Sequence, residues 1–290
     1  MPFTFAHPAA AIPLQRILKH RAVLSALVIG SMAPDFQNFL PFDVERADSH
    51  SFAGMFWFSL PVGMAIFLVF HLLLKKPLCS LLPTSIGARL SPVLHGPSLP
   101  PVSGSAIVCS LLLGTLTHLA WDAFTHYTVV TTSALPVLSR HLFSVGGYHV
   151  YLYKLLQHAS SLIGTLLVGY WCLRGLRRAP LPAQSPPSLL TWRQRCAVIG
   201  ILLLAPPLIG CGRAAHSWLV SYVPVILNDL VREAVVTAIS SFGILVILYS
   251  MIWHGIVRKP QEPSSSSHPS GFPFPSAKAH GQKPSTLVSK

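Results

Sequence analysis

The sequence predicts an all-α, polytopic membrane protein, a transmembrane helical bundle of about six membrane helices. Of its 290 residues, 51% are hydrophobic and only 10% are charged, whereas soluble domains usually carry about 25% charged residues. Six apolar stretches come close to the length of about 20 residues with which a helix crosses the hydrocarbon core. Lys and Arg gather in alternate connections between these stretches. Because backbone groups cannot stay unpaired in lipid, such stretches are expected to be helical.

The six stretches differ in how well they fit a membrane span. The second, third and sixth have full length, whereas the fourth and fifth are slightly short. Pro206-Pro207 predicts a kink in the fifth. Pro34-Asp35 interrupts the first, which is expected either to span or to form a broken, re-entrant segment buried in protein. The stretches are Ala22–Phe42, Ala53–Leu74, Ser105–His126, Leu155–Leu173, Cys196–Cys211 and Ala234–Val257.

The distribution of positive charge predicts the orientation. With the N-terminus inside, six crossings place 16 of the 21 Lys and Arg residues in inside segments and 5 in outside segments. Cytoplasmic loops carry such an excess. We therefore expect a multi-pass protein of the cell (inner) membrane with cytoplasmic N- and C-termini. Residues 1–257 form its membrane helical domain, and residues 258–290, rich in Pro, Ser, His and Lys, form a disordered cytoplasmic tail.

Charge and cysteine content exclude several classes of protein. The formal net charge of +13 is compatible with nucleic-acid binding, but the cations lie between apolar segments, so we expect membrane lipid and no nucleic acid as partner. Five scattered cysteines without a CxxC pair exclude a disulfide framework and a thiolate metal site. No GxSxG motif is present, which disfavours a serine nucleophile.

Ionisable residues inside apolar stretches are the candidate site. Asp35 and Asp122 lie within such stretches, where an ionisable group costs at least about 2.5–3.5 kcal/mol and normally faces a partner or a wet cavity. In the six-span topology, the outer loop after the first span and the outer parts of the third and fourth spans hold further ionisable residues that could converge with them at the extracytoplasmic face. These are His50, His118, His126 and His158. The alternative is that His–Asp pairs only join helices, at about 0.6 kcal/mol each.

The third stretch carries a polar stripe that suits a divalent metal. His118, Asp122 and His126 stand at i, i+4 and i+8, so they share one helix face. Imidazole and carboxylate are standard ligands of Zn²⁺. The rise from His118 to His126 is about 12 Å. On a straight helix, one ion can therefore bind only an adjacent pair, either His118 with Asp122 or Asp122 with His126. The remaining histidine then contacts a ligand residue without binding the ion, binds a second metal ion, or reaches the first ion through a bend at the helix end.

At these residues the chain resembles a known family. It is similar to an uncharacterised bacterial membrane-protein family, domain of unknown function 4184, over most of residues 1–257. The matching segments are Met1-Pro2-Phe3-Thr4-Phe5-Ala6-His7-Pro8-Ala9-Ala10, Gly30-Ser31-Met32-Ala33-Pro34-Asp35-Phe36, His50-Ser51-Phe52-Ala53-Gly54, Leu60-Pro61-Val62-Gly63, Lys76-Pro77-Leu78, Gly114-Thr115-Leu116-Thr117-His118-Leu119-Ala120-Trp121-Asp122 and Leu156-Gln157-His158-Ala159-Ser160-Ser161.

A more distant likeness bears on chemistry. An early His, a Pro-Asp, a His-Ser and a later His-x-x-x-Asp are similar to the membrane-bound metal-dependent hydrolases. This likeness implies a metal site of His7, Asp35, His50, His118, Asp122 and His126. His7 precedes the basic residues 16–21, so it can join only if the first stretch is re-entrant or residues 1–15 dip into the bundle.

Three functions follow from these residues. The first is a metal-dependent hydrolase at the outer face, with Zn²⁺, with Asp35 as ligand or general base, and with a phospholipid or another membrane-embedded ester as substrate. The second is a transporter that uses intramembrane His and Asp residues. The third is a structural or accessory membrane protein whose polar groups join helices.

Overall fold

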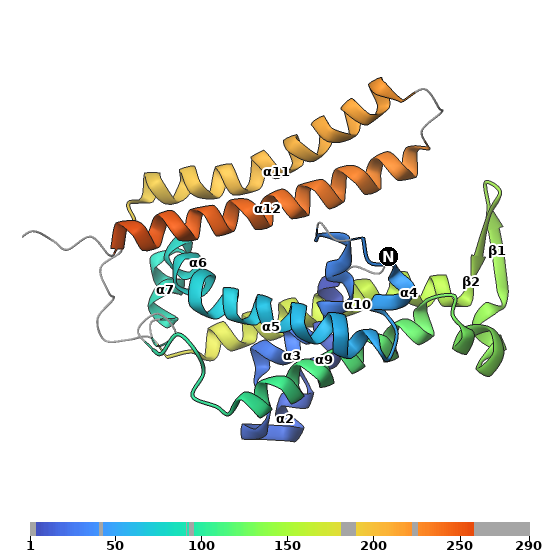
Figure 1. The fold of residues 1–290 in the computed structure, drawn as a ribbon, viewed down its shortest axis with the longest axis horizontal. Helices are drawn as coiled ribbons and strands as arrows, with labels where there is room; N and C mark the ends of the chain where they lie inside the picture. The colour runs from blue at the N-terminus through green and yellow to red at the C-terminus, as the bar shows by residue number, and fades with distance from the viewer. Residues whose placement is uncertain are drawn as a thin grey trace, which may run out of the picture.

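The computed structural model describes residues 4–40, 43–90, 92, 96–180, 190–221 and 226–257 (Figure 1). The predicted tail 258–290 lies outside these residues. In the described part, five helices are long and apolar enough to span a membrane. They are Met55–Leu81, which comprises η4 (Met55–Ser59), α5 (Leu60–Val69), η5 (Phe70–Leu74) and α6 (Lys75–Leu81), then α9 (Gly104–Thr125), α10 (Leu152–Arg178), α11 (Trp192–Val220) and α12 (Leu227–Val257).

These helices correspond to the second to sixth predicted stretches, and the all-α membrane bundle is confirmed. All of them except α9, which has the length of the third stretch, run longer than the apolar stretches because their ends continue into polar sequence, as the Arg-rich end of α10 illustrates. The α11 helix continues through Pro206 and Pro207. In Figure 1, α11 and α12 lie side by side along one edge of the bundle. Leu81, Leu202 and Val246 pack this pair against α6.

The first predicted stretch does not form a spanning helix. It forms α3 (Leu24–Gly30) and the 3-10 helix η3 (Ala33–Asn38), and seven residues of α-helix rise only about 10 Å. Short helices leave many backbone groups unpaired, which lipid does not tolerate but a protein interior does. The alternative of a broken segment buried in protein is therefore the one that the structure has.

Residues 4–38 form a re-entrant hairpin within the bundle. The chain enters through η1 (Thr4–Ala6), α1 (Pro8–Ala11), α2 (Leu14–Leu18) and η2 (Lys19–Arg21), and α3 and η3 bring it back. The hairpin closes where the Thr4 hydroxyl donates a hydrogen bond to Asp35, with an O–O distance of 2.7 Å. At its turn, the amide of Val23 donates to Ser110 near the start of α9.

Two glycines let the hairpin contact α9 backbone to backbone. A Cβ atom at Gly30 would lie 2.1 Å from the carbonyl oxygen of Leu111, and one at Gly114 would lie 2.3 Å from that of Leu27. The Thr115 hydroxyl donates to the carbonyl of Gly30 across the same contact. Small residues permit this approach in membrane proteins, where dispersion and polar contacts hold helices together.

The ends of the described chain lie at opposite ends of the bundle. Thr4 lies beside Asp35, whereas α12 ends where the His254 ring nitrogen Nε2 lies 3.0 Å from the carbonyl oxygen of Leu73. The sequence predicted six spans, whereas the described residues contain five helices long and apolar enough to cross a membrane, because the first stretch forms only short helices.

The remaining elements are short and lie outside the five long helices. They are α4 (Arg46–Ser49), α7 (Thr84–Arg89), η6 (Val130–Ala134), η7 (Pro136–Ser139) and an antiparallel hairpin of β1 (His141–Val145) and β2 (Tyr148–Tyr151). Gly146 and Gly147, with φ of 55° and 81°, form its turn, because glycine adopts positive φ without strain. The sequence did not predict this hairpin, which extends beyond the start of α10 in Figure 1.

We expect Gly114→Ala to destabilise the protein, because the added methyl group must push α9 away from α3. Overpacking of a close contact costs about 1–3 kcal/mol, and thermal unfolding in detergent should show a lower midpoint. Gly169→Ala is the matched control, since a Cβ at Gly169 on α10 meets nothing within 4 Å. Equal midpoints for the two variants would contradict the close contact.

Candidate metal centre

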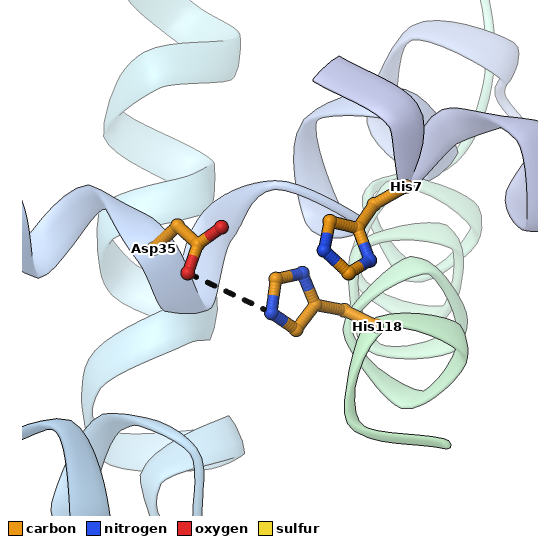
Figure 2. A group of neighbouring side chains, drawn as sticks. All are labelled: His7, Asp35 and His118. Carbon is orange, nitrogen blue, oxygen red and sulfur yellow. Dashed lines mark ion pairs between the residues drawn. The ribbon is translucent and has the colours of Figure 1, made fainter. Parts of the chain in front are cut away.

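Four separate segments bring ionisable side chains to one buried cluster. His7 precedes α1 in the re-entrant hairpin, Asp35 belongs to η3, and His50 follows α4. The α9 helix contributes His118 and Asp122, and His126 follows its last turn. His7, Asp35, His118 and Asp122 are all buried. Figure 2 shows His7, Asp35 and His118 gathered from their three elements.

Three donor atoms in this cluster have the spacing of a metal site. The distance between Nε2 of His50 and Nε2 of His118 is 3.3 Å. Each of these nitrogens lies 3.5 Å from Oδ2 of Asp122. A tetrahedral ion with bonds of about 2.0–2.1 Å holds its ligand atoms about 3.3–3.4 Å apart. The three atoms thus form nearly one face of such a tetrahedron, and these residues could hold a metal ion.

Hydrogen bonds to the other ring nitrogens indicate that both histidines present lone pairs to this face. Nδ1 of His118 lies 2.8 Å from the carbonyl oxygen of Ser31, which can only accept, so Nδ1 carries the proton. Nδ1 of His50 lies 2.8 Å from the hydroxyl of Ser49, and that hydroxyl donates to the carbonyl of Arg46. A histidine ligand typically donates its second N–H in this way, which leaves Nε2 free for the metal.

Asp35 and Arg46 border the triad. Oδ1 of Asp35 lies 3.3 Å from Nε2 of His50 and 3.8 Å from Nε2 of His118. Nη2 of Arg46 donates to Oδ2 of Asp122 at 2.6 Å, and its Nη1 lies 3.5 Å from Oδ1 of Asp35. Two carboxylates face one guanidinium here, so the buried cluster retains negative charge. A buried carboxylate normally requires a compensating cation.

Burial keeps the histidines outside the spanning helices neutral. Burial, together with the neighbouring His118, lowers the pKa of His7 to about 3 against the opposing effect of Asp122 and Asp35. Burial also lowers the pKa of His50. Neutral imidazole is the form that binds metals, so neither ring supplies the missing positive charge at neutral pH.

Several buried polar atoms of the cluster have no hydrogen-bond partner in the described structure. They are Nδ1 and Nε2 of His7, Oδ1 of Asp122 and Nε2 of His126. His7 is 1% exposed, and its ring stacks on that of His118 with centroids 3.8 Å apart. More than 90% of buried polar groups are normally paired, so this concentration of unpaired atoms marks a place where the cluster lacks a partner.

The structure brings together six of the seven residues that the sequence singled out, including His7, which the re-entrant hairpin carries into the bundle. His158 does not join them, because its side chain is exposed on α10, where the neighbouring Gln157 points inward instead. Sequence reasoning counted Arg46 only as an outer-loop charge. Its spacing of four residues before His50 was a usable signal, since i and i+4 share one helix face.

A polar cavity of about 820 Å³ opens beside the cluster. Arg46 lines it, together with Asn38 from η3 and Asp229 and Arg232 from the first turns of α12. Because Arg46 also pairs with Asp122, this residue connects the cavity with the buried centre. A molecule bound in the cavity would therefore contact the guanidinium group of Arg46, which borders the buried centre.

No curated protein and no solved structure matches the chain. One family does match, and it agrees with the resemblance seen in the motifs around His7, Asp35, His50 and Asp122. The family model, described as a domain of unknown function (DUF4184), covers residues 1–251. This range includes the re-entrant hairpin, every residue of the cluster and nearly all of the five long helices, and the chain belongs to this family.

Proposed function

We propose that the protein is a metal-dependent hydrolase with a zinc centre near the extracytoplasmic face of the cell membrane. The observation that carries the proposal is the triad of His50, His118 and Asp122, with distances of 3.3, 3.5 and 3.5 Å between its donor atoms. Two His ligands, one carboxylate and an open fourth position are typical of catalytic zinc, whereas structural zinc sites are closed by four protein ligands.

Each neighbouring group has a role in hydrolysis. A bound divalent ion supplies Lewis acidity toward a phosphoryl or acyl oxygen. Asp35, fixed by the Thr4 hydroxyl at 2.7 Å, is the general base that accepts a proton from the attacking water. Arg46 offers its guanidinium to an anionic oxygen of the substrate, for which its planar fork is suited.

The substrate class follows from the cavity and the membrane. The cavity borders the first turns of α12, a helix that is apolar over most of its length, so it lies near the level of lipid headgroups. Four carboxylates line the cavity beside Arg46 and Arg232, so we assign the phosphate contact to the guanidinium of Arg46, which borders the metal centre. We therefore propose a phospholipid or another membrane-embedded phosphoester as substrate.

The distribution of positive charge supports this orientation. The end of the bundle opposite the centre carries the basic turn at Lys19 and Arg21 and the last turn of α10 with Arg177 and Arg178. Cytoplasmic segments are enriched in such residues. The centre then faces the extracytoplasmic side, with the end of α12 on the cytoplasmic side and Thr4 in the outer half.

A structural role without metal is the second candidate, and one observation favours it. Arg46 already pairs with both Asp35 and Asp122, so it partly replaces the charge of an ion. In that case the histidines and carboxylates serve to join α9 to η3 and α4.

Metal analysis of purified protein distinguishes the two candidates. We expect stoichiometric zinc or manganese in wild-type protein and its loss in Asp122→Asn, because the amide carries no charge. His158→Ala is the matched control, since His158 is exposed and outside the cluster. Wild-type protein that stays free of metal after incubation with excess Zn²⁺ would rule out the hydrolase.

Asp35→Asn should retain the metal but lose hydrolysis. Removal of a general base costs about 10²–10⁴-fold in rate, and the three atoms of the triad do not include Asp35. The measurement is phosphodiester hydrolysis in mixed micelles with the metal content determined in parallel. Full activity in this variant would exclude Asp35 as the base.

Arg46→Gln should lower the thermal midpoint in EDTA, because it leaves two buried carboxylates without their guanidinium. Excess Zn²⁺ should raise the thermal midpoint of this variant by more than it raises that of wild-type protein, since ion and guanidinium compensate the same charge. A Zn²⁺ response equal to that of wild type would mean that Arg46 and the ion do not share this charge.

A further inference from the structure

We propose that the centre holds two divalent cations bridged by Asp122. The first lies against Oδ2 of Asp122 in the triad described above, and the second lies against Oδ1, with His7 and His126 as its other ligands. This inference rests on the proposed metal centre, which it extends from one ion to two.

The stacking of two imidazoles separates the ions. The centroids of the His7 and His118 rings lie 3.8 Å apart, with an interplanar angle of 22°, and Figure 2 shows the two rings as direct neighbours. An imidazole binds a metal through a lone pair in the plane of its ring. The two lone pairs lie in nearly parallel planes, an arrangement that disfavours a shared ion at bonds of about 2.0–2.1 Å. We therefore assign His7 and His118 to different ions, although with Asp35 their donor atoms lie close enough together to hold one.

His7 instead faces the unused oxygen of Asp122. Its Nε2 lies 3.7 Å from Oδ1 of Asp122, and Nδ1 of His126 lies 3.3 Å from the same oxygen. Ligand atoms of one zinc ion lie about 3.3–3.4 Å apart, so both contacts to Oδ1 are close to a ligand spacing, and binding of one ion would draw His7 and His126 toward each other.

Two of the three donors proposed for the second ion, Oδ1 of Asp122 and Nε2 of His7, are unpaired buried atoms, whereas the unpaired nitrogen of His126 is Nε2 and not the donor Nδ1. Oδ1 of Asp122 and both ring nitrogens of His7 are buried without a hydrogen-bond partner, and His7 is 1% exposed. By contrast, both histidines of the first site have a hydrogen-bond partner on their second ring nitrogen. This partner is the carbonyl of Ser31 for His118 and the hydroxyl of Ser49 for His50. The unsatisfied groups thus gather on the side of Asp122 that faces away from the triad.

A bridging carboxylate gives the two-ion arrangement of many phosphoester hydrolases, in which the ions lie about 3.5–4 Å apart and contact both the attacking and the leaving oxygen. Two dications against two carboxylates leave a net positive centre, to which Arg46 adds. This charge favours an anionic phosphoester over a neutral carboxylic ester.

The test is the number of Mn²⁺ ions per chain and their magnetic coupling. Full-length protein in detergent is loaded with Mn²⁺, freed of excess ion and examined by elemental analysis and electron paramagnetic resonance. We expect two ions per chain with the spectrum of a coupled pair in wild type. His126→Ala should hold one ion with an uncoupled spectrum, and His158→Ala, the matched control, should hold two. His126 is half-buried, so its loss disturbs folding less than that of His7.

The outcomes separate this inference from the proposed function. One ion per chain in wild type, retained in His126→Ala and lost in His50→Ala, would overturn the second site and leave the hydrolase standing. No ion in wild type would overturn both. Two ions in both wild type and His126→Ala would assign the second ion to other ligands and overturn the bridged site.

Discussion

The backbone contact between α3 and α9 at Gly30 and Gly114 is the constraint on which the centre depends. It brings the carbonyl of Ser31 to within 2.8 Å of Nδ1 of His118, and this hydrogen bond fixes both the ring position and the tautomer of the central ligand. It also sets where η3 begins, three residues later, and so where Asp35 lies. A helix of larger residues would hold α3 farther from α9, and the imidazole would lose this acceptor.

The re-entrant hairpin solves a second problem, that of bringing polar groups to membrane depth. A spanning helix would have presented Asp35 on its surface, where lipid contact costs several kcal/mol. As part of a short segment buried among longer helices, Asp35 is 1% exposed and receives the Thr4 hydroxyl. The same fold carries His7 inward. The short helices of the hairpin thus pack against α5, α9 and α10, which is where a membrane protein tolerates irregular backbone and ionisable groups.

The sequence was sufficient for what depends on local pattern. Hydrophobic length predicted five of the long helices, and the spacing of His118, Asp122 and His126 predicted their common face. It was insufficient for what depends on tertiary packing. The return of the chain at Lys19–Arg21 follows from contacts with α9 that no local pattern encodes. Arg46 was overlooked because sequence alone does not distinguish an outer-loop arginine that faces solvent from one that pairs with a buried carboxylate.

Charge balance links the fold to the chemistry. Two carboxylates that only joined helices would be most stable with every oxygen paired, as Oδ2 of Asp35 is with Thr4. Asp122 is instead half satisfied, with a guanidinium on Oδ2 and no hydrogen bond on Oδ1. An unpaired buried acceptor costs about 1–3 kcal/mol, and an apolar replacement of similar size would avoid that cost. Nε2 of His7 and Nδ1 of His126 lie 3.7 and 3.3 Å from this oxygen without a hydrogen bond to it. Such an arrangement is costly as a helix contact but well suited to receive a cation.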